Sequence, residues 1–127
     1  MSEKSWITPE VWEAALAAAD VLVAITDPEG RIVFFNRACE QLTAYSEDEV
    51  RGRTLWDVLM DAADASAIEA AFKTLPSDGR VRRQRLRWRG KDGWERPIEW
   101  SSVTVRGQDG AVAYVVGSGF DVGEWQA

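Results

Sequence analysis

The sequence contains no histidine and a single cysteine, Cys39, among its 127 residues. Without histidine there is no Ser-His-Asp or Cys-His catalytic group, no histidine-rich metal site and no histidine ligand for a haem iron. One cysteine cannot form a disulfide within the chain, which is typical of proteins in a reducing compartment. We therefore expect a cytoplasmic protein and predict no metal site.

Long apolar runs and positive charge are also scarce. No stretch approaches the roughly 18 apolar residues that a membrane-spanning helix needs, and residues 1–6 lack the basic-then-apolar pattern of a signal peptide. The formal net charge is −6, from 15 basic and 21 acidic side chains. A nucleic-acid-binding protein needs a cationic surface to displace counterions. We therefore predict one domain with no membrane segment and no nucleic-acid partner.

The acidic side chains are not arranged as a catalytic pair. Residues 47–49 and Asp61 stand at the expected starts of two helices, where carboxylates favour the positive end of the helix dipole. No combination of side chains supplies a nucleophile, a base and a group to orient them. We predict that the chain by itself is not an enzyme and has no catalytic residues.

The basic charge is concentrated in one segment. Residues 1–79 hold 6 basic and 15 acidic side chains, whereas residues 80–127 hold 9 basic and 6 acidic ones. Alternate residues of a strand share a face, which places Arg83, Arg85, Arg87 and Arg89 on one face and Gln84, Leu86 and Trp88 on the other. One interpretation is a solvated face paired with Glu95 and Glu99 of the next strand. The other is a protein–protein contact.

Caps and turns divide the first two thirds of the chain into segments. Thr8-Pro9-Glu10 combines a side-chain cap with a proline at the first helical position, and predicts a helix to about Ala19 that docks on another surface. Two β-rich runs follow, Val21–Thr26 and Arg31–Phe35. Four helices are then expected: one at 37–43, a single turn that begins after the capping-box residue Ser46, one near 55–60 and one at 62–75.

Three longer strands are predicted in the last third, at about Val81–Arg89, Glu95–Arg106 and Ala111–Phe120. Glycine-containing turns at 90–93 and 107–110 separate them. The order is a helix, two strands, several short helices, a longer helix and a three-stranded meander. This order predicts an α+β fold, because a parallel α/β fold would alternate strands and helices strictly.

Several segments together resemble the PAS domain, the sensory module of bacterial signalling proteins. They are Thr26–Ile32, Asn36–Thr43, Tyr45–Arg53, Lys91–Gly93, Glu99–Ser102 and Tyr114–Gly119. The last three resemble the PAS type found ahead of diguanylate cyclases and sensor kinases. The resemblance implies a five-stranded antiparallel sheet in the order 2-1-5-4-3 with short helices on one face. It divides the chain into a flanking helix (1–20), the PAS domain (21–124) and the start of an exit to an output segment (125–127).

The resemblance also bears on cofactors, which remain unknown. The light-sensing LOV branch has a cysteine just after the Gly-Arg pair that ends its second short helix, and Leu55 is the equivalent residue here. The glutamine that reads the flavin would fall at Gly119. We therefore predict neither a LOV-type flavin adduct nor a histidine-ligated haem. Cys39 lacks a basic partner, so we interpret it as a packed small residue.

Candidate cavity-lining residues follow from strand alternation and from the resemblance. In flavin-binding relatives the inner faces of the last three strands turn towards the helices and the ligand. The corresponding candidates, with Asn36, are Trp88, Ile98, Trp100, Ser102, Gly117 and Gly119.

Tryptophans opposite glycines permit two interpretations. One is complementary core packing without a ligand, and the other is an aromatic-walled pocket for a planar or aromatic small molecule. In the second case Asn36, Ser102 and Thr104 would supply the few polar contacts that orient a ligand.

The end of the last strand implies how a signal would leave. In the PAS family an Asp-hydrophobic-Thr-Glu quartet connects this strand to an output helix, and Asp121-Val122-Gly123-Glu124 stands in its place. We therefore predict a non-catalytic sensory domain that binds a small molecule or a partner and relays through Asp121 and Glu124. A ligand-free dimerisation or scaffold domain is the alternative. We expect a homodimer in either case, in two-component or cyclic-di-GMP signalling.

Overall fold

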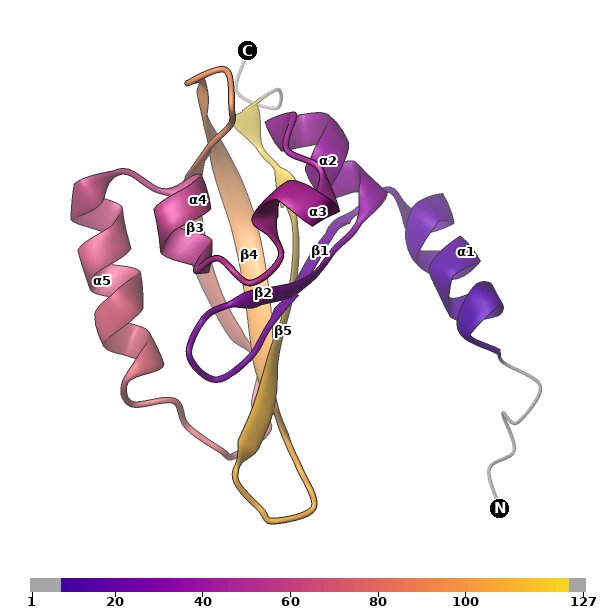
Figure 1. Cartoon of the computed structure of the whole chain (residues 1–127), viewed down its shortest axis with the longest axis vertical. Coiled ribbons are helices and arrows are strands. Elements are labelled where there is room, and N and C mark those ends of the chain that lie inside the picture. The colour runs from indigo at the N-terminus through magenta and orange to yellow at the C-terminus, as the bar shows by residue number, and fades with distance from the viewer. Residues whose placement is uncertain (1–7, 124–127) are drawn as a thin grey trace.

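One curved antiparallel sheet organises the molecule (Figure 1). The computed structural model describes residues 8–123. The strands are β1 (Leu22–Thr26), β2 (Ile32–Phe35), β3 (Arg82–Arg89), β4 (Glu95–Arg106) and β5 (Val112–Asp121). Their spatial order is β2-β1-β5-β4-β3 and every neighbouring pair is antiparallel. This confirms the predicted α+β fold and its strand order.

Helices begin where the sequence supplies side-chain caps. They are α1 (Pro9–Ala19), α2 (Arg37–Thr43), α3 (Glu47–Val50), α4 (Leu55–Leu59) and α5 (Ala62–Phe72). Asn36 caps α2, Ser46 forms a complete capping box with Glu49 at α3, and Asp61 caps α5. None of these helices is long and apolar enough to span a lipid bilayer.

Helix α5 ends at Phe72, whereas the sequence pattern predicts an end at Leu75. Pro76 disfavours helical backbone at the residue before it, and the Thr104 hydroxyl donates a hydrogen bond to the Pro76 carbonyl at 2.8 Å. Leu75 therefore lies in the linker to β3, where it faces the interior beside the sheet.

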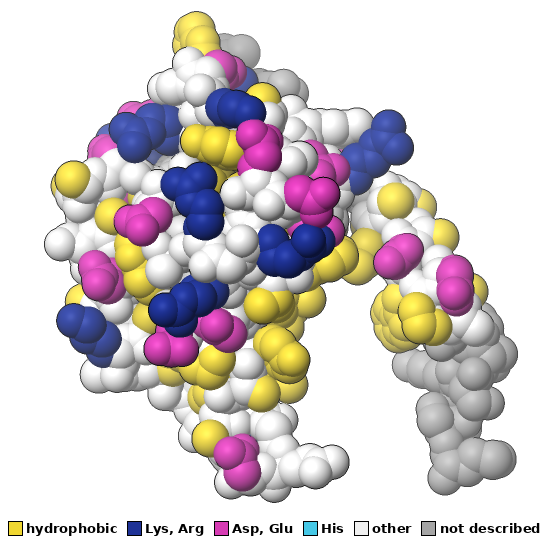
Figure 2. Space-filling view, viewed as in Figure 1, with side chains coloured by type: hydrophobic (Ala, Val, Ile, Leu, Met, Phe, Trp, Pro, Cys, Tyr) yellow, Lys and Arg dark blue, Asp and Glu magenta, His cyan; other side chains and the backbone are white. Residues whose placement is uncertain are grey.

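Helix α1 stands away from the sheet (Figures 1 and 2). Thr8 caps it as predicted, but the helix has no buried residue, and Trp12 is 55% exposed. Within residues 8–123, therefore, no other element buries a residue of α1.

The core lies between the inner face of the sheet and helices α2 to α5. Strand alternation directs Leu22 and Ala24 of β1, Ile98 and Trp100 of β4, and Trp88 of β3 into it. The rings of Trp88 and Trp100 are tilted by 53° with centroids 5.0 Å apart, which is a favourable aromatic geometry. Burial of this apolar surface is the main stabilising contribution to the fold.

Candidate functional site

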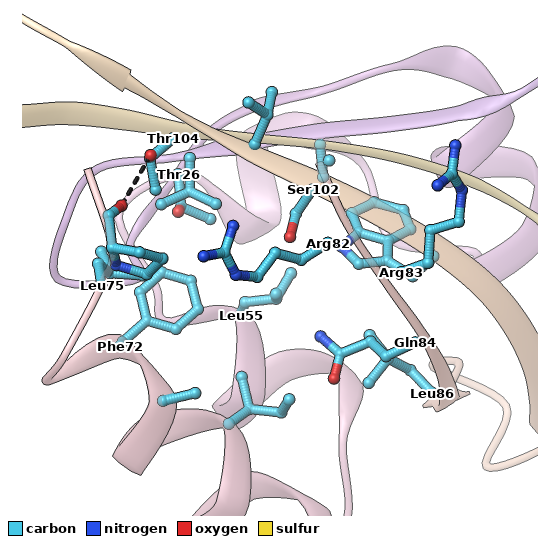
Figure 3. Close-up of a pocket in the computed structure, with 18 of the residues that line it drawn as sticks. Thr26, Leu55, Phe72, Leu75, Arg82, Arg83, Gln84, Leu86, Ser102 and Thr104 are labelled. Carbon is cyan, nitrogen blue, oxygen red and sulfur yellow. Dashed lines mark hydrogen bonds between the residues drawn. The ribbon is translucent and has the colours of Figure 1, made fainter. Parts of the chain in front are cut away.

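A cavity of about 310 Å³ lies between the inner face of the sheet and α5 (Figure 3). Its apolar walls come from α4, α5, β3, β4 and β5 and include Leu55, Ile68, Phe72, Leu86, Trp100 and Val115. The volume is at the lower end of the range of ligand pockets in proteins.

The indole of Trp100 forms one wall because the facing strand carries glycines. A Cβ atom built on Gly117 would overlap the indole, and one built on Gly119 would come within 2.8 Å of its Cε3. Trp100 thus packs against two residues without side chains, as complementary core packing requires. Trp100 and Gly117 also line the cavity. Complementary packing of the tryptophan on the glycine is therefore observed, and an aromatic-walled pocket for a planar or aromatic ligand stays a prediction.

The structure divides the predicted site residues into two groups. Trp100, Ser102 and Gly117 line the cavity. Trp88, Ile98 and Gly119 are buried on the inner face of the sheet but are not part of the cavity lining.

Asn36 lies outside the cavity lining, and both polar atoms of its side chain form hydrogen bonds with backbone groups at the start of α2 and in or next to β1. Its side-chain oxygen accepts hydrogen bonds from the backbone N–H groups of Val23 and Cys39, both at 3.1 Å. Its amide nitrogen donates to the carbonyl of Val21 at 2.8 Å. The observed role of Asn36 is therefore to position the start of α2 on the sheet.

Thr26 is a cavity residue that the sequence analysis missed. It is 3% exposed, it lines the cavity, and its hydroxyl is one of three buried side-chain polar atoms without a hydrogen-bond partner among residues 8–123. The other two, Thr54 Oγ1 and Trp88 Nε1, belong to residues outside the cavity lining. Alternation along β1 from Leu22 and Ala24 would have placed Thr26 on the inner face.

Arginines at the cavity were also missed as site residues. Arg80, Arg82 and Arg83 line it, and Arg82 stands opposite Ser102 in the strand register, on the inner face. Arg82 donates hydrogen bonds of 2.9 and 3.2 Å to the two carboxylate oxygens of Asp78. These hydrogen bonds from Arg82, with one from the Arg80 backbone, lower the pKa of Asp78 to about 2.

Two of the four arginines predicted to share the outer face of β3, Arg85 and Arg87, are paired with acidic side chains. Arg85 contacts Glu99 at 2.8 Å, and Arg87 contacts Asp64 at 3.2 Å and Glu95 at 4.0 Å. All these side chains are partly exposed, so each pair contributes little to stability. The interpretation as a solvated, paired face holds for these two arginines.

Cys39 is completely buried. Its thiol lies 3.4 Å from the Val23 carbonyl, and desolvation raises its pKa to about 12. The thiol is therefore protonated at neutral pH and is a poor nucleophile. Within residues 8–123 no group of three or more His, Cys, Asp or Glu side chains is placed to hold a metal ion.

The exit from β5 is held by Asp121. Its carboxylate accepts a hydrogen bond from the Gly123 backbone at 2.8 Å and lies 3.9 Å from the Arg96 guanidinium. The Val122 N–H donates to the Pro97 carbonyl at 3.0 Å, which ties the exit to β4. The second predicted relay residue, Glu124, lies outside the described residues.

Comparison with known proteins agrees with this architecture. A family model described as a PAS domain matches residues 20–124. The chain therefore belongs to the PAS domain family of sensory modules. No curated protein matches the sequence.

Solved structures share the fold. An RNA-binding Light-Oxygen-Voltage receptor is 27% identical with a TM-score of 0.76; the match covers 99% of this chain but 37% of the receptor, so the chain spans little more than a third of it. A PAS domain of an HTR-like protein from Haloarcula marismortui is 18% identical with a TM-score of 0.73; the match covers 88% of this chain and 95% of that one. The PAS domain of the Cronobacter turicensis RpfR quorum-sensing receptor, in complex with BDSF, is 24% identical with a TM-score of 0.69; the match covers 81% of this chain and 94% of that one.

Proposed function

We propose that this PAS domain is a non-catalytic sensor that binds a small molecule in the cavity between the sheet and α5. The Thr26 hydroxyl is the observation that carries the proposal, because it is buried without a partner in a cavity whose walls are mainly apolar. An unpaired buried hydroxyl costs about 1–3 kcal/mol. A ligand with an apolar body and a hydrogen-bonding atom at Thr26 would recover that cost.

The walls indicate how the predicted residues would take part. Trp100 offers one face of its indole as an apolar wall, Gly117 lets that indole lie against β5, and Ser102 offers a polar contact. Trp88, Ile98 and Gly119 would act indirectly by fixing the orientation of the Trp100 indole, and Asn36 by fixing α2 to β1.

Native mass spectrometry of the purified protein, followed by denaturing analysis of any released molecule, tests the proposal. We expect a stoichiometric small molecule or, with an added ligand, a new mass. Ala71→Phe adds a ring to the α5 residue that lines the cavity, and Ala70→Phe adds the same ring at an exposed neighbour that does not. Loss of binding in Ala71→Phe alone supports the proposal, whereas equal binding by both variants contradicts it.

We further propose that ligand binding is relayed along β5 to its exit. Val115 and Gly117 line the cavity, and the same strand ends at Asp121. Glu124 belongs to the same proposed exit. Hydrogen exchange should then change at the Val122 and Gly123 amides when ligand is added. No change there, with ligand bound, would contradict the relay.

The resemblance to PAS domains of cyclases and kinases supports a regulated effector of the cyclic-di-GMP or two-component type. We place the protein in the cytoplasm, where a reducing environment suits its one buried thiol.

Self-association is the second candidate function. Trp12 on α1 is exposed, as are Val105, Tyr114 and Phe120 on the face of the sheet away from the core, and Figure 2 shows hydrophobic side chains on α1 and on the body beside it. Exposed apolar surface of this kind marks interaction sites. Sedimentation analysis should show a homodimer that Trp12→Glu or Phe120→Glu dissociates. A monomeric wild-type protein at high micromolar concentration would exclude this function.

A further inference from the structure

We infer that the ligand is a small aliphatic carboxylate, and that Arg82 releases Asp78 and binds the carboxylate of the ligand in its place. The inference rests on the proposed ligand-binding function and adds the charge of the ligand, the residue that binds it and the internal competitor.

The charge around the cavity differs in sign from that of the chain. Arg80 and Arg82 line the cavity, although the whole chain carries a net charge of −6. Arg83 also belongs to the lining, but alternation from Arg82 directs its side chain to the outer face of β3, away from the cavity (Figure 3). Arg80 forms no ion pair with any side chain of residues 8–123, and Asp78 is the one carboxylate paired with Arg82. A cationic rim around a low-dielectric cavity attracts anions.

Arg82 is the arginine placed to reach a ligand. It stands on the inner face of β3 directly opposite Ser102, and Figure 3 shows both side chains extending over the cavity above Leu55. The Ser102 hydroxyl makes no hydrogen bond within the described part of the chain. A guanidinium and a hydroxyl side by side supply the donors that one carboxylate accepts.

The Arg82 guanidinium already binds one carboxylate in bidentate geometry: it donates hydrogen bonds of 2.9 and 3.2 Å to the two oxygens of Asp78. The Arg82 and Asp78 side chains are 46% and 41% exposed, so water screens their attraction and the pair is weak. A ligand carboxylate would make similar contacts while its chain buries apolar surface in the cavity. Exchange of one carboxylate for the other is therefore favourable for an amphiphilic anion.

The exchange would also alter the linker between α5 and β3. This linker is held at Pro76 by the Thr104 hydroxyl and at Asp78 by Arg82. When Arg82 turns to a ligand, Asp78 keeps only the hydrogen bond from the Arg80 backbone N–H at 3.0 Å. Loosening of the linker around Asp78 is thus the expected structural consequence of binding.

Calorimetric titration with octanoate and with 1-octanol, which has the same chain without the charge, tests the inference. Octanoate should bind wild-type protein more tightly than octanol. Arg82→Gln should weaken octanoate binding about tenfold and leave octanol unchanged, because it removes the charge-assisted hydrogen bonds. Asp78→Asn should strengthen octanoate binding about threefold, because it removes the competing charge of an exposed pair. Arg85→Gln, at a paired arginine outside the cavity, is the matched control and should change neither affinity.

The outcomes separate this inference from the proposed function. Equal binding of octanoate and octanol, unaffected by Arg82→Gln, would leave a ligand-binding cavity but overturn the role of Arg82. Weaker octanoate binding in Asp78→Asn would show that Asp78 orients Arg82 and does not compete with the ligand. Absence of binding of either molecule to folded protein, checked by circular dichroism, would overturn the inference, while a different co-purifying molecule would still support the sensor function.

Discussion

The indole of Trp100 on β4 lies against the backbone of Gly117, its diagonal neighbour on β5, so closely that a single added methyl group would overlap it. Both residues belong to central strands of the sheet, where the backbone cannot yield easily. This contact fixes one wall of the cavity.

Gly117→Ala should lower the free energy of unfolding by about 1–3 kcal/mol, as expected when a methyl group is forced into a packed core. Urea denaturation measures the change. Gly107→Ala is the control, because a Cβ there meets only ordinary contacts of 3.4 Å or more, and it should alter stability by less than about 0.5 kcal/mol. If Gly117→Ala is as stable as Gly107→Ala, the indole is free to move.

Two buried threonines should respond to the same substitution with opposite signs. Thr26 is 3% exposed with an unpaired hydroxyl, so Thr26→Val in ligand-free protein should raise the free energy of unfolding by about 1 kcal/mol. Thr43 is 2% exposed, and its hydroxyl donates to the Cys39 carbonyl and accepts from the Tyr45 N–H. Thr43→Val should therefore destabilise the fold by about 1–2 kcal/mol. Thermal and urea denaturation should rank the variants in this order. The reverse order would show that Thr26 has a partner in solution.

Asn36→Ala should destabilise the whole domain by about 2–3 kcal/mol, because it removes the cap of α2 and leaves the Val23 N–H of β1 and the Val21 carbonyl before β1 without their partner. Thr8→Ala removes the cap of α1, but α1 buries no residue. That variant should change global unfolding by less than about 0.5 kcal/mol. A large effect of Thr8→Ala would indicate that α1 is docked on a partner.

The ion pair at the cavity gives a pH prediction. Arg82 holds the pKa of Asp78 at about 2, below its ordinary 3.8. Since the folded-state pKa is the lower one, the stability that this pair contributes is present above pH 3.8 and is lost as the pH falls towards 2. Arg82→Gln should return the pKa of Asp78 towards 3.8, as measured by carboxyl NMR titration. Arg85→Gln should leave it unchanged. An unaltered pKa in Arg82→Gln would mean that the Arg80 backbone hydrogen bond dominates.

Cys39 should be inert in the native state. Its thiol is buried, and desolvation raises its pKa from 9.0 to about 12, so almost no thiolate exists at pH 8. An aromatic disulfide reagent should therefore react only after unfolding in guanidinium chloride. A fast reaction with native protein would indicate local opening between α2 and β1.

The limits of sequence reasoning appear in two side chains of the cavity. Alternation along β3, β4 and β5, with the family resemblance, identified six strand residues as cavity-lining candidates. Trp100, Ser102 and Gly117 line the cavity, and Trp88, Ile98 and Gly119 do not. Thr26 and Arg82 were not identified as cavity-lining residues, although both follow the same alternation on their strands. A periodic pattern shows which way a side chain points. It does not show whether a partner from another element meets it there.

The order of elements, the helix starts and the strand faces were predictable from local patterns, because caps, turns and alternation act between residues close in the chain. Contacts between distant segments set the end of α5 before Leu75, the pairing of Asn36 with β1 and the contact of Arg82 with Asp78 beside Ser102. These outcomes depend on which surfaces remain unfilled when the sheet and helices pack together. That packing is a property of the whole fold and is not encoded in any one segment.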